Sequence, residues 1–345
     1  MDLAIEILNK FIENNYEAYI VGGYVRNYLL NINSNDIDIC TNAKPKEIKK
    51  IFNNIKLPKE KYNSIILYYK NNKFEITTFR KELEYKNRKP IKIEYVNTLI
   101  EDLKRRDFTI NTLCINNKRE VIDLLNAKKD LDEKIIKTVK PAKESFAEDN
   151  LRMLRAIRIA TQLKFNLSKD IINEIEKDSI KKISKFRKKQ ELDKIFESKN
   201  LKIGVKLLKS FDLLEVLDIK NIDEIKLIDS KIGIWSQLKT EYEFTKKDLR
   251  EINIIKALLK KKINDYDIYK YSYNLCNIAS KIKDKSLKNN LIINSRKDID
   301  IVYEDIKDIT NNINEAYEYI EKLIILKKIE NKKEVLIKYL KEKYN

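Results

Sequence analysis

A pair of adjacent glycines, Gly22 and Gly23, constrains this chain more than any other feature. They are two of its four glycines, and they follow a short apolar run in AYIVGGYVRNYLL. Glycine lets the backbone approach a polyphosphate closely, and amide N–H groups at the start of a helix attract anions. The pattern predicts a strand over residues 19–21, a turn at the glycines, a helix over 26–30 and a strand over 36–40, arranged around a phosphate site.

Two aspartates, Asp36 and Asp38, lie in the second predicted strand. Because side chains alternate across a strand, both carboxylates are expected on one face, with Ile37 and Ile39 on the core face. Two hard oxygen ligands at this spacing suit Mg²⁺, which binds proteins through one or two carboxylates plus substrate phosphates. The alternative is an ordinary pair of surface aspartates, but the glycine turn and Arg26 ahead of them favour the metal site.

These two motifs, GGYVRN at 22–27 and DID at 36–38, resemble those of the nucleotidyltransferase superfamily that includes CCA-adding enzymes and bacterial poly(A) polymerases. That family carries Gly-Gly-x-Val-Arg-Asp before Asp-x-Asp, so Asn27 departs from it by keeping a side-chain acceptor and losing a charge. The resemblance implies that a metal, Mg²⁺, is held by Asp36 and Asp38, and that a nucleoside triphosphate is bound by Gly22, Gly23 and Arg26.

Two further strands are predicted over 64–69 and 73–79, around a turn at positions 71 and 72. The second strand contains EITTF, and the family places a third active-site carboxylate in such a segment. Glu75 is therefore a candidate catalytic residue by resemblance. Its position facing away from Phe74 and Ile76 fits a solvent-exposed acid equally well.

Residues 81–96 are polar and lack periodicity, which predicts a loop, and part of this segment resembles the flexible loop of CCA-adding enzymes. The segment EDLKRRDFTIN that follows, 101–111, is a near-complete match to another motif of the family. Paired arginines neutralise charge and bind phosphate bidentately, and an adjacent aspartate can hold one of them in place. The resemblance places Arg106 beside the triphosphate; the alternative is a charged helix end.

The segment EDNLRMLRAIRI, 148–159, predicts a helix with Glu148, Arg152 and Arg155 on one side. Without further context, this pattern is typical of a salt-bridged stripe on a protein surface. The family has a similar helix that reads the incoming base. The resemblance therefore implies nucleotide binding by Asp149, Arg152, Arg155 and Arg158.

The formal net charge of +18 points to an anionic partner, most simply nucleic acid, although a general bias toward lysine contributes to it. The run KKISKFRKK, 181–189, is either a solvated face or a contact for an RNA backbone. The chain has no histidine, which excludes His-based zinc sites and Ser-His or Cys-His nucleophiles. Because Cys40, Cys114 and Cys276 also follow no metal spacing, we expect no zinc.

No apolar run approaches the roughly 20 residues that span a bilayer, and acidic residues interrupt the apolar N-terminus. We therefore expect no membrane association and a cytoplasmic location. Strand patterns come first and helical patterns follow, which predicts an α+β fold. The resemblance divides it into a small mixed nucleotidyltransferase head (1–137), a helical neck that selects the nucleobase (138–199) and a helical body and tail that bind tRNA (200–345).

The activity that the resemblance implies is addition of C, C and A to a tRNA 3′ end from CTP and ATP, without a nucleic-acid template. A poly(A) polymerase, or an enzyme that adds only CC or only A, is the alternative within the family. The loop-like segment 81–90 argues against a CC-only enzyme, which lacks it in the family. A loose similarity of 291–300 and 327–334 to the tail of short bacterial CCA-adding enzymes argues against a poly(A) polymerase. A non-catalytic RNA-binding relative is disfavoured by Asp36, Asp38 and Arg106.

Overall fold

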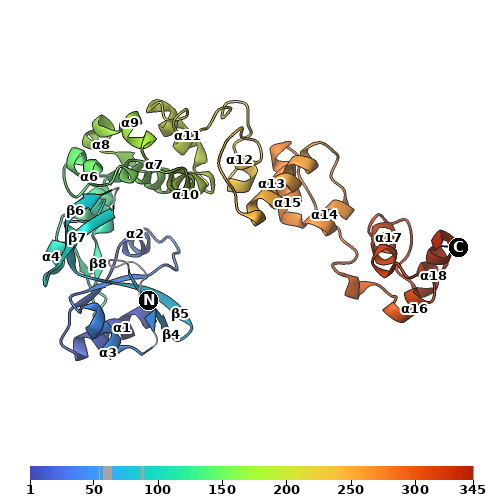
Figure 1. The fold of residues 1–345 in the computed structure, drawn as a ribbon, viewed down its shortest axis with the longest axis horizontal. Coiled ribbons are helices and arrows are strands. Elements are labelled where there is room, and N and C mark those ends of the chain that lie inside the picture. Colours follow the sequence, from blue (N-terminus) through green and yellow to red (C-terminus); the bar gives the residue numbers. More distant parts are fainter. Residues whose placement is uncertain (54, 57–63, 87–88, 345) are drawn as a thin grey trace. The chain divides into compact units, whose positions relative to one another are not determined.

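The computed structural model describes residues 1–53, 55–56, 64–86 and 89–344 (Figure 1). The chain forms two compact units, unit 1 (Met1–Asp218) and unit 2 (Ile219–Asn345). All described strands lie in unit 1, and the described part of unit 2 contains helices and connecting segments. The predicted α+β fold class is confirmed.

A seven-stranded mixed sheet forms the centre of the first part of unit 1. The strands predicted over 64–69 and 73–79 are confirmed, and they pair antiparallel around the turn at Lys70 and Asn71. Only β2 and β5 pair in parallel; the other neighbours are antiparallel. In spatial order the strands are β3 (Ile55–Lys56), β4 (Ile65–Tyr69), β5 (Asn72–Thr78), β2 (Asp38–Thr41), β1 (Ala18–Val21), β8 (Cys114–Ile115) and β9 (Val121–Ile122).

Consecutive residues of the central strands β1 and β2 are buried, and their side chains point to opposite sides of the sheet. Both faces of the sheet are therefore covered. Helix α1 (Asp2–Glu13) packs next to β1 and buries Ala4, Ile7, Leu8 and Phe11, the face expected from its 3.6-residue period. A second cluster contains Val21 and Cys40 together with Leu99 and Leu103 of α4 (Leu99–Leu103). The central strands are therefore held rigidly, and only their ends are available for a site.

Residues 80–86 and 89–95 form two paired strands, so the loop predicted over 81–96 is wrong. Strands β6 (Arg80–Lys86) and β7 (Lys89–Tyr95) pair with each other in a sheet of their own. Apolar and charged residues do alternate in both strands, as in LEY at 83–85 and IKIEY at 91–95. Most described side chains of these strands are nevertheless exposed, including Leu83 and Ile91.

The single helix predicted over 148–159 is also wrong, because two helices meet there: α6 (Ala142–Glu148) and α7 (Leu151–Leu163). Asp149 separates them with an extended backbone, φ −147° and ψ 101°. Its Oδ1 atom accepts a hydrogen bond from the Leu151 N–H at 3.0 Å. An aspartate side chain that competes for backbone donors in this way ends one helix and starts the next.

The remaining elements of unit 1 are short helices around the sheet and around α7, with one small parallel ladder between β10 and β11. Thr138 pairs with Phe108, so the chain is continuous in its contacts across the predicted boundary at 137. The division into head, neck, and body with tail stays a prediction. These elements are α3 (Pro45–Ile51), η1 (Thr109–Asn111), α5 (Ala127–Asp132), β10 (Ile135–Ile136), β11 (Asn166–Leu167), α8 (Lys169–Glu174), α9 (Lys177–Lys181), α10 (Lys185–Phe196) and α11 (Leu201–Ser210).

The regular secondary structure in the described part of unit 2 consists of helices only. Trp235 is buried and packs edge-on against Tyr242 and Phe244, and a second cluster forms around Ile320, Ile324, Leu336 and Leu340. Among the described helices, none is long and apolar enough to cross a membrane. The helices are α12 (Lys231–Trp235), α13 (Lys246–Leu259), α14 (Asp265–Tyr271), α15 (Tyr273–Ile282), η2 (Arg296–Asp298), α16 (Tyr303–Lys307), α17 (Ile313–Ile325) and α18 (Lys333–Tyr344).

Candidate active site

The glycine turn connects β1 directly to helix α2 (Gly23–Leu29), which begins three residues earlier than predicted. Gly22 has φ +86°, a conformation that L side chains rarely adopt. A Cβ atom at this position would lie 3.3 Å from Asp38 Oδ2 and 3.8 Å from Arg106 Nη1. The fold therefore brings together three predicted site residues from distant parts of the sequence, and it requires glycine where they meet.

The three candidate catalytic carboxylates come from the start of β2, the segment before it and the neighbouring strand β5, which lie in the middle of the sheet. Asp38 opens β2 and stands opposite Glu75 in the parallel pairing with β5, so the two side chains share a face. Asp36 is exposed and precedes the strand, so the predicted start of the strand at residue 36 is wrong. Asp36 still acts electrostatically on Asp38, and the Glu75 carboxylate accepts a 3.0 Å hydrogen bond from Lys73 Nζ.

The pKa of the Asp38 carboxyl is raised to about 6, chiefly by burial, against the opposing effect of Arg106 and with smaller contributions from the carboxylates of Glu75 and Asp36. Among the described residues, no group of three or more Asp, Glu, Cys or His is arranged to hold a metal by itself. Two carboxylates that complete the coordination shell of a hard cation with substrate phosphates and water are the usual donor set for Mg²⁺, so the residues present fit that ion.

The raised pKa of Asp38 predicts a pH-dependent cost in stability. An acid whose pKa is higher in the folded than in the unfolded chain destabilises the fold when it ionises. For Asp38 this cost grows as the pH rises from 3.8, the ordinary pKa of the side chain, through about 6. Without divalent cations, we expect Asp38→Asn to raise the free energy of unfolding by up to about 3 kcal/mol above pH 7, and to have no such effect near pH 3.5. Urea unfolding of both proteins across this pH range measures the difference. A gain that is equal at both pH values contradicts this cause.

Arg106 is held from behind by Asp102, a fully buried residue of α4 that the sequence analysis did not single out. The Asp102 carboxylate accepts hydrogen bonds from Arg105 Nε at 2.9 Å and from Arg106 Nη2 at 3.1 Å. Burial alone would raise the pKa of Asp102, but the two guanidinium groups lower it below its usual value. The Nε atom of Arg106 is buried without a partner. Asp102 thus fixes both arginines, a role that an acid three and four residues before them could have suggested.

Arg26 is buried beneath the glycine turn. Its Nε and Nη2 atoms donate to Asn27 Oδ1 at 3.1 and 2.9 Å, and its Nη1 atom donates to Asn111 Oδ1 at 2.6 Å. Asn27 therefore accepts both hydrogen bonds on its single amide oxygen, without the negative charge of an aspartate. The pKa of Arg26 is lowered to about 10, chiefly by burial and then by the nearby Arg158. The positive charge under the turn is consequently poorly compensated.

The arginines of α7 are interior ion-pair partners, in contrast to the exposed stripe that we considered. Arg155 Nε donates to Asp107 Oδ2 at 2.9 Å, so the aspartate next to Arg106 holds an arginine of the neck. Arg158 Nε lies 2.9 Å from Glu191 of α10, an ion pair without hydrogen-bond alignment. Arg155 is the most exposed of the three, and its pKa is raised chiefly by Asp107.

Arg152 is buried at the junction of α6 and α7. Its Nη1 atom lies 2.9 Å from both Ser145 Oγ and Glu148 Oε2, and its Nη2 atom donates to the Arg105 carbonyl at 3.2 Å. Arg152 thus connects the helix junction to the segment that carries Arg106. Asp149 precedes it by three residues and accepts its backbone N–H through the Asp149 carbonyl at 3.0 Å.

Lys194 of α10 is a further member of the site that sequence reasoning missed. Burial lowers the pKa of Lys194, and Arg158 and Arg155 lower it further, whereas Glu191 and Asp36 raise it. Helix α10 packs against α7, and the Glu191 carboxylate lies 2.9 Å from Arg158 Nε. The sequence of this part of α10, QELDKI, resembles a family motif, but that resemblance assigns no role to Glu191 or Lys194.

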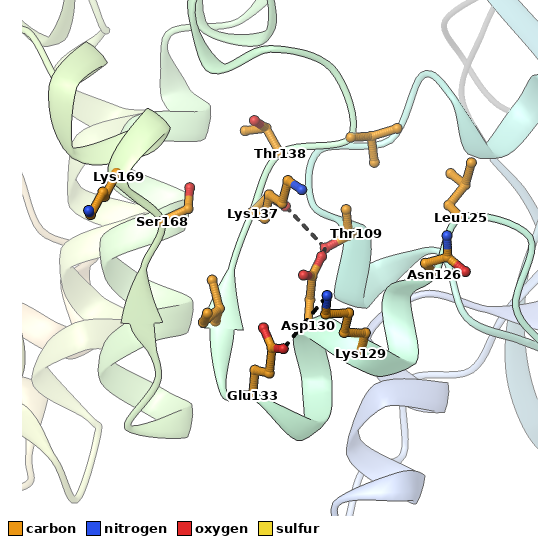
Figure 2. Close-up of a pocket in the computed structure, with 12 residues that line it drawn as sticks. Thr109, Leu125, Asn126, Lys129, Asp130, Glu133, Lys137, Thr138, Ser168 and Lys169 are labelled. Atoms are coloured by element: carbon orange, nitrogen blue, oxygen red, sulfur yellow. Dashed lines mark hydrogen bonds and ion pairs between the residues drawn. The ribbon is translucent and has the colours of Figure 1, made fainter.

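A separate cavity of about 560 Å³ lies near α5, β10 and the start of α8 (Figure 2). Thr109 Oγ1 donates to Asp130 Oδ2 at 2.6 Å on its wall, and Lys129 and Glu133 form an ion pair at 3.9 Å. None of the predicted site residues lines this cavity. The candidate active site is instead the group of carboxylates around the start of β2.

Two family models match the chain: the Poly A polymerase head domain over residues 18–137, and the probable RNA and SrmB-binding site of polymerase A over residues 164–222. A CCA-adding enzyme of Ligilactobacillus salivarius is 35% identical, with 98% of this chain and 96% of the relative covered. A CCA-adding enzyme of Bacillus subtilis is 29% identical, over 98% and 97% of the two chains.

Solved structures share the fold. The Bacillus stearothermophilus CCA-adding enzyme in complex with CTP superimposes with a TM-score of 0.75 at 22% identity, over 99% of this chain and 97% of that one. The Thermotoga maritima CCA-adding enzyme complexed with tRNA gives a TM-score of 0.57 at 21% identity, over 99% and 95%.

Proposed function

The chain belongs to the family of CCA-adding enzymes, and we propose that it adds C, C and A to the 3′ end of tRNA, with CTP and ATP as substrates. The observation that carries the proposal is the meeting of Gly22, Asp38 and Arg106, which supplies a close backbone approach, a metal-binding carboxylate and a phosphate-binding cation in one place. The near full-length match to curated CCA-adding enzymes favours this activity over a poly(A) polymerase or a CC-only or A-only enzyme.

Enzymes of this family depend on a metal ion, and we propose Mg²⁺ held by Asp36 and Asp38, with Glu75 beside them. When bound, the ion would lower the pKa of the attacking 3′-hydroxyl and offset charge on the leaving pyrophosphate. Gly22 leaves room for the triphosphate, and Arg106, fixed by Asp102, faces its charge. Arg26 supports the turn from below and adds positive potential. The chain contributes mainly positioning and electrostatic stabilisation.

The three-part division assigns further roles. In this proposal the head, 1–137, carries the chemistry, and the neck, 138–199, selects the base through Asp149, Arg152, Arg155 and Arg158. The body and tail, 200–345, bind the tRNA. A cytoplasmic location is part of the same proposal.

Incubation of the full chain with tRNA that lacks CCA, Mg²⁺ and each labelled nucleotide tests the activity. We expect CTP to be incorporated twice, ATP once and only after CTP, and UTP and GTP very little. Repeated addition of A would instead identify a poly(A) polymerase, and arrest after two C residues would identify a CC-adding enzyme. No incorporation with any nucleotide would contradict an enzymatic function.

The net charge of +18 predicts that tRNA affinity depends strongly on salt. Lysines and arginines that contact phosphates release counterions, so we expect the affinity to fall on the order of a hundredfold between low and moderate salt. Filter binding or fluorescence anisotropy at a series of KCl concentrations, with Mg²⁺ held constant, measures the slope. An affinity that is independent of salt would show that the basic surface is not the tRNA contact.

A further inference from the structure

Phe186 is the most exposed large apolar side chain described in this chain, with 67% of its surface accessible. It lies in the first turn of α10, which follows Ile183, a residue buried in the core. Phenylalanine has no polar group that gains from contact with water. Single exposed apolar side chains are nevertheless common on protein surfaces, so exposure indicates a binding site only together with other features. The surroundings of Phe186 do distinguish it.

Exposed cations surround the ring in sequence. Lys181, Lys182, Lys185 and Arg187 all have exposed side chains. The first turn of α10 contains no acidic residue, and positive charge there opposes the helix dipole. Arg187 Nη1 donates to Gln190 Oε1 at 3.1 Å. Lys188 is the exception, because it is buried and its Nζ atom donates to the Val216 carbonyl at 2.9 Å. This arrangement does not stabilise the helix, so it points to an anionic partner.

The position of α10 relates this surface to the active site. Arg187, Glu191 and Lys194 follow one another at helical spacing and therefore share a face of α10. Glu191 pairs with Arg158 of α7, and Arg155 of the same helix pairs with Asp107, the residue next to Arg106. Phe186 precedes Lys194 by eight residues, about 12 Å along the helix axis, which is the length of three to four stacked nucleotides.

We propose that Phe186 stacks on a base of the unpaired 3′ end of the tRNA, while Lys181, Lys182, Lys185 and Arg187 contact its phosphates. The inference rests on the proposed function, because it places the 3′ end at Asp36 and Asp38. An aromatic ring stacks on any base, which suits a strand whose terminal sequence changes as it grows. A protein partner would need a broader apolar patch, whereas here one ring stands among cations.

The test uses the full chain with Phe186→Ala, Phe186→Leu and Phe186→Tyr, and tRNA that lacks CCA. Loss of the ring is expected to raise the Kd and the KM for tRNA about fivefold to a hundredfold, with little change in the KM for CTP. Tyrosine should restore the affinity, and leucine should not, because it keeps the apolar contact and loses the aromatic face. Tyr68→Ala, which removes another exposed ring from unit 1, is the matched control and should bind like wild type.

Salt dependence separates stacking from charge. Phe186→Ala should leave the slope of log Kd against log salt unchanged, whereas Lys182→Ala should reduce it by about one. Thermal unfolding of all variants should match wild type, since the ring is exposed. If wild type elongates tRNA but Phe186→Ala binds it equally well, or if leucine restores binding as tyrosine does, the stacking role is wrong. If wild type neither binds nor elongates tRNA, the proposed function itself fails.

Discussion

Replacement of Asp38 by alanine or asparagine is expected to reduce nucleotide incorporation about a thousandfold or more, and to leave tRNA affinity within a few fold. Asp38 is partly buried beside Gly22, and its pKa is raised to about 6. A metal ion held by Asp38, as we propose, would stabilise the transition state by several kcal/mol, and each 1.4 kcal/mol is tenfold in rate. We expect Asp36→Ala to reduce incorporation as well, because Asp36 is proposed to bind the same metal ion.

Single-turnover incorporation of CTP at saturating tRNA measures this effect. Asp132→Asn is a suitable control, because it removes one negative charge from an exposed carboxylate that pairs only with Lys128 at the surface of α5. Thermal unfolding of Asp38→Asn checks that the fold is intact. Near-normal incorporation by the Asp38 variants would show that the metal is held elsewhere.

Replacement of Asp149 is expected to relax the selection of nucleotides. Cytosine and adenine both present an amine that donates beside a ring nitrogen that accepts, and uracil and guanine present the reverse. A carboxylate only accepts and a guanidinium only donates, so the base-reading pair that we propose, Asp149 with Arg152, would complement C and A and oppose U and G. Selection then arises from repulsion and unpaired groups as much as from attraction.

The helix junction makes Asp149→Asn the sharper variant. Asparagine keeps the Oδ1 acceptor that caps α7 through the Leu151 N–H, and its amide can also donate to a uracil carbonyl. We expect the ratio of kcat/KM for CTP over UTP to fall about tenfold to a hundredfold, since an unpaired buried polar group costs 1–3 kcal/mol. Arg152→Ala is less informative alone, because it also removes the partner of Glu148 and Ser145.

Asp170→Asn is the matched control, because Asp170 Oδ2 accepts the Ala142 N–H at 2.7 Å at the start of α6, much as Asp149 does for α7. It should keep the CTP preference. If Asp149→Asn and Asp149→Ala both keep wild-type rates and wild-type rejection of UTP and GTP, Asp149 is a helix cap and ion-pair partner only.

Features that depend on local backbone chemistry were predictable from the sequence. A glycine pair after an apolar run specified the turn at Gly22, because only glycine adopts its backbone conformation without strain. Two runs rich in β-branched and aromatic residues around an Asn-Asn turn specified β4 and β5, and a period of 3.6 residues specified α1. The order of these patterns along the chain sufficed for the α+β fold class.

The composition of the site was decided only by the tertiary structure. Arg26 and Asn111 are 85 positions apart, and Asp107 and Arg155 are 48 apart, so nothing local in the sequence indicates that they pair. Asp102 differs, because it holds Arg105 and Arg106 at helical spacing. The strands β6 and β7 were missed although apolar and charged residues alternate in them, because lysines and glutamates dominate this segment. Local patterns fix which elements form, whereas packing between distant elements fixes which charged side chains meet, because a charge inside a fold is stable only where a distant partner compensates it.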